Sequence, residues 1–259
     1  MKIPLYQVDA FTDRMFAGNP AAVCPLDGWL DDEALQAIAA ENNLSETAFF
    51  VPEGEGFRLR WFTPTTEVDL CGHATLATAH VVFEHLHPER DTIEFESKSG
   101  PLVVTRDGGR IRLDFPAIPA EPAEPPSGLV EALGATPQVL LRARKLLAVF
   151  TSEDDVRNIA PDFEALKRTA PYGIVISAAG DTHDFVSRFF HPAIGVPEDP
   201  VTGAAHCVLT PYWAKRLGKT AFHARQVSKR GGDVWCELHG DRVHLSGHAV
   251  LYLRGEITI

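Results

Sequence analysis

One sequence feature restricts the possible folds of this chain more than any other: a segment that occurs twice. Both copies, residues 60–75 and 188–205, contain an arginine, an aromatic pair, a proline, an acidic loop and a glycine that opens an apolar run. The two arginines lie 128 residues apart, and Gly72 and Gly203 lie 131 apart. Several matches in order at nearly constant spacing indicate duplication. The chain is therefore predicted to contain two copies of one α+β unit of about 130 residues.

Each copy is predicted to have a central helix that is buried on every side. Residues 72–83 and 203–214 carry small and apolar side chains all round, which is typical of a buried helix rather than an amphipathic one. Pro211 is expected to kink or shorten the second helix, because proline lacks the backbone N–H. Flanking strand patterns complete the prediction: two pseudo-symmetric halves, each a β-sheet wrapped around a buried helix.

The boundary between the halves is predicted at a proline-rich stretch. Residues 115–126 contain five prolines, which favour a stiff and extended connector. We therefore predict an N-terminal half over residues 1–115, a linker over 116–126 and a C-terminal half over 127–259. Within the first half, a helix that begins after Asp31 is predicted to end at residues 42–43, where asparagine tolerates a left-handed backbone.

Composition excludes several classes of function. The net charge is −11, which disfavours nucleic acid and anionic membranes as partners. No apolar run approaches the roughly 20 residues of a membrane span, and no signal-peptide pattern opens the chain. The four cysteines show no metal or redox spacing, so we expect no metal, no cofactor and a cytoplasmic location. A homodimer is the expected assembly, because homodimers are frequent among soluble enzymes.

Glu46 is the first candidate catalytic residue. Its neighbours include Leu44, Ala48, Phe49 and Phe50, and such surroundings remove water from a carboxylate. Loss of hydration favours the neutral form, which can donate a proton, and so suits a general acid/base. The alternative is a glutamate at the end of a strand whose carboxylate remains in water.

The two loop-to-helix junctions, at Gly72 and Gly203, form the second candidate site. Glycine at a helix start lets a ligand approach the backbone, and the free N–H groups there attract an anion such as a carboxylate. Symmetry-related halves would place both junctions on either side of one cleft. The alternative is that each glycine serves only to begin a helix. His73 is the imidazole best placed to donate to a substrate or move a proton.

Three motifs of the chain resemble the PhzF-like phenazine-biosynthesis isomerase family, which has the diaminopimelate-epimerase-like fold. They are residues 43–49 (Asn-Leu-Ser-Glu-Thr-Ala-Phe), residues 72–75 (Gly-His-Ala-Thr) and residues 198–206 (Glu-Asp-Pro-Val-Thr-Gly-Ala-Ala-His). The similarity runs over the whole length, beginning with residues 8–11 and 18–20. The resemblance is specific for the family but not for a substrate.

The resemblance implies a role for each matching residue. Glu46 matches the general acid/base that shifts a proton, and His73 and Asp199 match polar partners that orient the substrate and assist proton movement. The implied substrate-binding residues are Gly72, Ala74, Gly203 and Ala204. Ala204 departs from the family pattern, which often has a serine whose hydroxyl helps to bind the substrate carboxylate. This departure puts the original phenazine substrate in doubt.

A comparison of the two halves favours one catalytic base over two. A racemase of this fold needs a base on each face of the carbon, and related epimerases use a cysteine from each half. Here the matching positions hold Cys71 and Thr202, and a threonine hydroxyl is far too weak an acid. We therefore predict a cofactor-independent isomerase that shifts a proton on a small carboxylic acid, expected to be cyclic. The alternatives are an epimerase that uses Cys71 with Glu46 or Asp199, and a non-catalytic protein that binds small acids.

Overall fold

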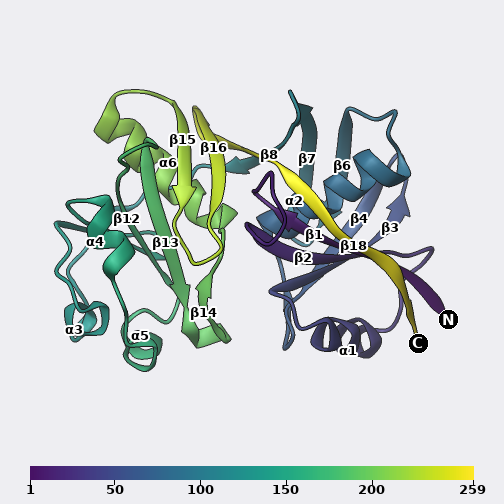
Figure 1. Cartoon of the computed structure of the whole chain (residues 1–259), viewed down its shortest axis with the longest axis horizontal. Coiled ribbons are helices and arrows are strands. Elements are labelled where there is room, and N and C mark those ends of the chain that lie inside the picture. The colour runs from purple at the N-terminus through teal and green to yellow at the C-terminus, as the bar shows by residue number, and fades with distance from the viewer. The chain divides into compact units, whose positions relative to one another are not determined.

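The two ends of the chain form neighbouring strands of one sheet. In the computed structural model, which describes residues 1–259, β18 (Ala249–Thr258) pairs antiparallel with β1 (Lys2–Ala10) along its length (Figure 1). Two compact units result: unit 1 comprises Met1–Asp114 and Ser246–Ile259, and unit 2 comprises Phe115–Leu245. The prediction that the C-terminal half runs to residue 259 is therefore wrong. Pairing between strands so distant in sequence leaves no local pattern from which it could be read.

Unit 1 wraps a curved sheet around one helix. Its strands are β1, β2 (Asn19–Pro25), β3 (Glu46–Glu53), β4 (Gly56–Phe62), β5 (Glu67–Val68), β6 (Thr92–Ser97), β7 (Gly100–Asp107), β8 (Arg110–Pro116) and β18. The outer helix is α1 (Asp32–Asn42); the inner helix α2 (Gly72–Val81) packs against β1, β2 and β3 and continues into a π-helical turn, η1 (Val82–Leu86). From β1 to β7 the pairings are antiparallel for β1–β2, parallel for β2–β3, antiparallel for β3–β4, parallel for β4–β6 and antiparallel for β6–β7.

Unit 2 repeats this sequence of pairings. Its strands are β9 (Glu121–Pro122), β10 (Val139–Arg142), β11 (Leu146–Val149), β12 (Ile174–Ala179), β13 (Phe185–His191), β14 (Val196–Asp199), β15 (Ala221–Gln226), β16 (Gly232–His239) and β17 (Arg242–Gly247). Its helices are α3 (Leu129–Leu133), α4 (Glu153–Asn158), α5 (Phe163–Thr169), the 3₁₀ turn η2 (Pro192–Ile194) and the inner helix α6 (Gly203–Leu217). From β10 to β16 the pairings alternate as in unit 1: antiparallel, parallel, antiparallel, parallel and antiparallel. The predicted duplication and fold class are confirmed.

The repeated arginine makes the same contacts in both units. Arg60 on β4 forms two hydrogen bonds to Glu67, of 2.7 and 2.9 Å, and Arg188 on β13 forms two to Glu198, of 2.7 and 3.0 Å. Each guanidinium also lies over the ring of the phenylalanine two positions along its strand, at 5.0 and 4.9 Å. Bidentate geometry combined with a cation–π contact requires arginine rather than lysine. The matched arginines therefore fix the acidic loop before each inner helix.

Pro211 lies inside α6, which continues to Leu217, so the helix is not shortened at the proline. Proline cannot donate to the carbonyl four residues earlier, which is that of Cys207. That carbonyl accepts a hydrogen bond of 3.0 Å from the N–H of Ile118 instead, so it is not left unpaired. Within the proline-rich stretch, Glu121 and Pro122 pair with β10 as an edge strand, where a missing N–H is tolerated. None of the helices combines the length and the apolar composition needed to span a bilayer.

Candidate active site

Glu46 and His73 meet inside unit 1. Glu46 is the first residue of β3, and His73 lies in the first turn of α2, which packs on the same sheet. The Oε2 of Glu46 is 3.1 Å from the Nε2 of His73, and only 16% and 5% of the two side chains are exposed. The alternative of a glutamate in open water is therefore excluded. The predicted acid/base and the predicted imidazole form one buried pair.

The other ring nitrogen of His73 faces two donors. The Nδ2 of Asn19, at the start of β2, is 3.1 Å from Nδ1, and the Sγ of Cys71 is 3.5 Å from the same atom. These donors favour the neutral tautomer that carries its proton on Nε2, toward Glu46. If the ring gains a second proton, rotation of the Asn19 amide would present its oxygen to Nδ1. Asn19 can therefore support His73 in both protonation states.

This arrangement suits proton transfer better than metal binding. Glu46, Cys71 and His73 bring potential ligand atoms within 4.8 Å of one another. However, Glu46 faces Nε2 and Cys71 faces Nδ1, and the two nitrogens of one imidazole point in different directions. One metal ion cannot be coordinated by both nitrogens of the same imidazole ring. Glu46 and His73 instead form a pair that can hold or pass a proton, with Cys71 on the far side of the ring.

Burial and neighbouring side chains shift the pKa of His73 in opposite directions. Burial disfavours the imidazolium of His73, but its interactions with Cys71 and Glu46 outweigh burial and raise the pKa of His73 well above its usual value. Burial, with a smaller effect from Glu46, raises the pKa of the Cys71 thiol to about 11. The thiol is therefore neutral near pH 7, and Glu46 is the charge that supports protonated His73 there. Cys71 is a buried thiol in contact with His73.

The reactive atoms of the pair have no well-aligned hydrogen bond. Glu46 Oε2 and His73 Nε2 are buried and lie at ion-pair distance, but neither has a hydrogen-bond partner of good geometry. Buried polar atoms without partners are rare in folded proteins, and each requires an explanation. A bound substrate would supply partners for both atoms.

The two inner helices begin without a side-chain cap. Of the outer helices, α1, α4 and α5 are capped by Asp31, Ser152 and Asp162, which accept hydrogen bonds from backbone N–H groups, whereas the short α3 begins after Gly128 without a side-chain cap. At α2 and α6 the cap residues, Cys71 and Thr202, make no such bond. The free N–H groups at these helix starts can therefore receive an anion. Gly72 is the first residue of α2, and the buried Ala74 lies in the same turn. Both residues are therefore at the helix start, where a carboxylate is expected to bind.

Asp199 belongs to a separate network in unit 2. It ends β14, and the hydroxyl of Thr202 donates to its Oδ2 at 2.5 Å. Gln226, fully buried on β15, accepts from the N–H of Thr202 at 2.9 Å and donates to the carbonyl of Asp199 at 2.7 Å. Gly203 and Ala204 follow in the first turn of α6. Gln226 was not among the predicted site residues, although it is a polar residue at an inward-facing position of an alternating strand.

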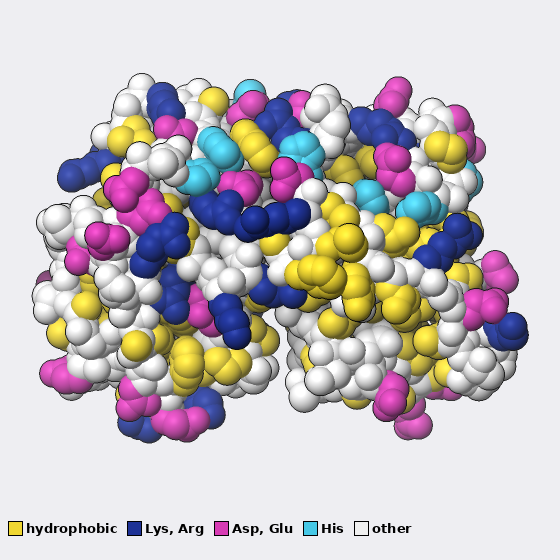
Figure 2. All heavy atoms as spheres, in the orientation of Figure 1, with side chains coloured by type: hydrophobic (Ala, Val, Ile, Leu, Met, Phe, Trp, Pro, Cys, Tyr) yellow, Lys and Arg dark blue, Asp and Glu magenta, His cyan; other side chains and the backbone are white.

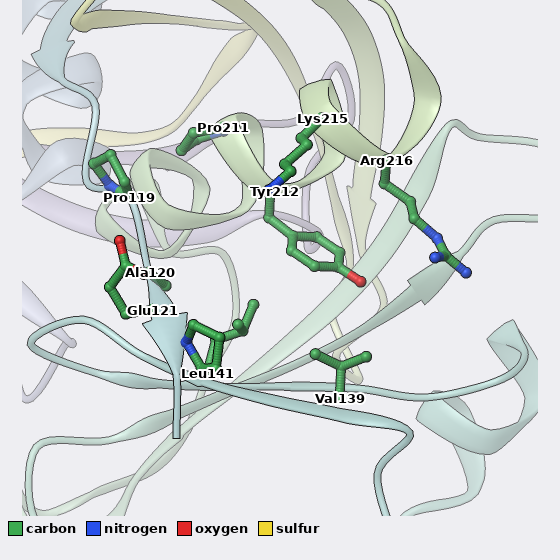
Figure 3. A pocket seen from close by; sticks show the side chains of 10 residues that line it. Pro119, Ala120, Glu121, Val139, Leu141, Pro211, Tyr212, Lys215 and Arg216 are labelled. Carbon is green, nitrogen blue, oxygen red and sulfur yellow. The ribbon is translucent and has the colours of Figure 1, made fainter. Parts of the chain in front are cut away.

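A groove of about 590 Å³ in unit 2 contains none of the predicted site residues. The ring of Tyr212 projects from α6 toward Val139 and Leu141 of β10, with Lys215 and Arg216 in the last turn of the helix (Figure 3). No histidine or cysteine lines this groove, and Glu121 is its only carboxylate. It lacks the paired acid and base that proton transfer requires.

Gly18 holds Asn19 in position, and its replacement is expected to destabilise unit 1. Gly18 has φ +63°, and a Cβ there would collide with the backbone oxygen of Ala10 and the side chain of Thr12. Gly18→Ala should lower the free energy of unfolding by about 2 kcal/mol or more, the left-handed backbone alone accounting for about 1–2 kcal/mol. Gly54→Ala is the matched control, because Gly54 has φ +59° but open space around it. Urea denaturation measures both, and equal losses would contradict the collision.

Comparisons with known proteins agree with this fold. The family model for phenazine biosynthesis-like proteins matches residues 8–255. An uncharacterized isomerase of Pseudomonas aeruginosa is 54% identical over 260 residues, which is 100% of both chains. The crystal structure of a PhzF-family phenazine biosynthesis protein from Enterococcus faecalis has a TM-score of 0.97 and 48% identity and covers 100% of both chains. A probable proline racemase from Agrobacterium radiobacter (TM-score 0.66, 11% identity, 99% of this chain and 92% of that one) shares the fold alone.

The close relatives define an isomerase, and its fold is diaminopimelate-epimerase-like. Within that class, the chain belongs to the phenazine biosynthesis-like, or PhzF, family.

Proposed function

We propose that this isomerase moves a proton between two carbon atoms of a small carboxylic acid, with Glu46 as the single acid/base and no cofactor. The observation that carries the proposal is the buried pair of Glu46 and His73, whose facing atoms lack hydrogen-bond partners of good geometry. A general base must lie within reach of the proton that it removes, and geometry of this kind is the first requirement.

The reaction requires one proton to leave and return. The Glu46 carboxylate removes a proton from a carbon of the substrate, and the electron pair of that C–H bond moves into the conjugated acid. Protonated His73 stabilises the negative charge nearby, and the N–H groups of Gly72 and Ala74 would hold the substrate carboxylate. Glu46 then gives its proton to a second carbon. The double bond has moved, and no atom has been gained or lost.

The state of Cys71 favours this single-base reaction over an epimerase. A second base on the opposite face would need a thiolate, but burial raises the pKa of the Cys71 thiol to about 11. Its sulfur also faces Nδ1 of His73 rather than an open position. Nucleophilic or basic cysteines have depressed pKa values instead. Cys71 therefore supports His73 and does not act as a base.

Residues of unit 2 are proposed to assist the same reaction. Asp199 would orient the substrate, and the helix-start amides of Gly203 and Ala204 would bind its polar groups. The uncapped start of α6 supports this role for its amides. Ala204 has no side-chain hydroxyl that could bind the substrate carboxylate. The preferred substrate is therefore expected to need fewer polar contacts to its carboxylate than the substrates of relatives that carry serine at this position. A cyclic acid remains the proposed substrate class, because a conjugated ring can delocalise the charge left by proton removal.

A homodimer in the cytoplasm is the proposed state of the enzyme. Met15, Phe16, Tyr252 and Leu253 are 40–70% exposed, and Figure 2 shows hydrophobic side chains gathered over β18 and β1. Such a gathering of apolar side chains on a soluble protein often marks a protein interface. A second copy of the chain is the proposed occupant, and sedimentation equilibrium tests it. The four buried, unpaired cysteines are consistent with a reducing compartment.

Deuterium incorporation tests the proposed function. The enzyme would be incubated in deuterium oxide with a panel of dihydroaromatic acids and amino acids, and each acid analysed by NMR. Deuterium is expected at the carbon that gains the proton in at least one cyclic acid, together with a shifted double bond. Inversion at an α-carbon without such a shift would favour the epimerase. Neither label nor a shifted double bond in any acid would contradict the proposed proton-shift chemistry.

A further inference from the structure

Three side chains of unit 2 converge at a point that the proposed reaction does not use. His183 lies in the turn between β12 and β13, His223 lies on β15 and Asp233 lies on β16. The Oδ1 of Asp233 is 3.2 Å from the Nε2 of His183 and 3.1 Å from the Nε2 of His223. Figure 2 shows histidine side chains beside acidic and basic ones on the outer surface of β15 and β16. Two imidazoles therefore share one carboxylate oxygen.

The spacing of these atoms matches that of ligands around a small divalent cation. Zinc binds histidine nitrogen and carboxylate oxygen at about 2.0–2.2 Å, so neighbouring ligand atoms in a tetrahedral site are about 3.3 Å apart. Both measured separations fall close to this value, and all three ligand atoms lie within 4.8 Å of one another. Only a small outward movement of the carboxylate would be needed to admit an ion.

Neighbouring groups hold all three side chains in this orientation. Arg225 donates to the other carboxylate oxygen, Oδ2 of Asp233, at 2.6 Å, which leaves Oδ1 directed at the imidazoles. The hydroxyl of Thr182 lies 3.0 Å from Nδ1 of His183 and can fix its tautomer with Nε2 free to coordinate. The ring of His223 stacks on Trp235 at 4.5 Å between centroids. Outer contacts of this kind orient the ligands of metal sites.

We propose that His183, His223 and Asp233 form a binding site for a divalent transition metal ion, with Zn²⁺ as the preferred ion. Two imidazoles and one carboxylate suit Zn²⁺ better than Mg²⁺ or Ca²⁺, which prefer oxygen ligands alone. The side chain of His223 is 41% exposed, so water can fill the fourth position. The ion would tie the β12–β13 turn to β15 and β16. Its role is to stabilise unit 2, independently of the reaction at Glu46.

Metal binding is tested on the full-length protein after removal of any affinity tag. Zn²⁺ would be titrated in competition with a chromogenic chelator, and Co²⁺ would serve as a spectroscopic probe of tetrahedral coordination. Wild-type protein should bind one Zn²⁺ equivalent that His183→Ala loses, and Asp233→Asn should weaken binding by more than about 100-fold, beyond the usual effect of outer-shell partners. His191→Ala is the matched control, because His191 is in unit 2 but faces the carbonyl of Pro171.

Thermal unfolding gives an independent measurement. Zn²⁺ should raise the melting temperature of the wild type and of His191→Ala, but not that of His183→Ala, because an ion that binds only the folded state stabilises it. Circular dichroism establishes that each variant is folded before titration. The proposal is wrong if the wild type binds no Zn²⁺ at micromolar concentrations, or if His183→Ala and Asp233→Asn bind it as tightly as the wild type.

Discussion

Replacement of Glu46 by glutamine is expected to lower kcat by about 10²–10⁴-fold, the range in which a positioned acid/base contributes to catalysis. Glutamine has nearly the same shape, so the packing at the start of β3 should persist. Its amide cannot accept and return a proton, and the buried pair with His73 would lose its charge. KM should change little, because the proposed carboxylate site lies at the helix N–H groups. Steady-state kinetics on the acid identified by deuterium labelling measures both constants.

Glu53→Gln is the matched control for this prediction. Glu53 ends the same strand, but it is exposed and pairs with Arg58 at the surface. An exposed pair of this kind contributes about 0–1 kcal/mol to stability and should not affect turnover. If Glu46→Gln retained activity while Cys71→Ala abolished it, the single-base reaction would be replaced by the epimerase mechanism.

His73→Asn is expected to produce the second large loss, again by about 10²–10⁴-fold in kcat/KM. Asparagine can still accept a hydrogen bond from Asn19, but it cannot carry the positive charge that stabilises the Glu46 carboxylate and the developing negative charge of the substrate. Wild-type activity should fall at high pH as His73 loses its proton. The pH profile of kcat/KM therefore distinguishes a charged partner from a purely structural one, and an unchanged alkaline limb in the variant would contradict the role of His73.

The same histidine predicts how stability depends on pH. Because the pKa of His73 is raised in the folded protein, the folded state binds the His73 proton more tightly than the unfolded state does. This contribution is fully present below the unfolded value of about 6.5 and is lost as pH rises through the higher folded pKa. The difference in free energy of unfolding between wild type and His73→Asn should therefore shrink from about pH 6 to pH 8.5. Urea denaturation across this range measures it, and a constant difference would show that the charge does not stabilise the fold.

Local patterns in the sequence predicted the features that depend on local physics. The duplication was visible because each unit needs the same bidentate arginine before its inner helix, as Arg60 and Arg188 show. The first helix begins at the predicted cap, Asp31, and ends at Asn43, which has the left-handed backbone expected of it (φ 49°). The resemblance assigned Glu46 and His73 to one reaction, but spacing could not predict their contact, because 27 positions and two strands separate them.

Features that depend on long-range packing escaped prediction. The pairing of β18 with β1 joins the two ends of the chain, and the sequence of neither strand specifies its partner. Asn19 contacts His73 only because α2 packs on β2, so its place in the Gly-Asn-Pro motif of residues 18–20 indicated no catalytic role. The helix α6 continues past Pro211 with the Cys207 carbonyl paired, because Ile118 supplies the donor. In each case a residue distant in sequence completes the hydrogen bonding.

One measurement tests the single-base proton shift most directly. The substrate acid would carry deuterium at the carbon that loses its proton, and a single turnover would be followed in ordinary water. Because Glu46 is mostly buried, the proton that it removes should return before complete exchange with solvent. A single-base shift therefore predicts that part of the label appears at the carbon that gains the proton, and that Glu46→Gln forms no labelled product. Complete replacement of the label by solvent hydrogen in every product molecule would contradict it.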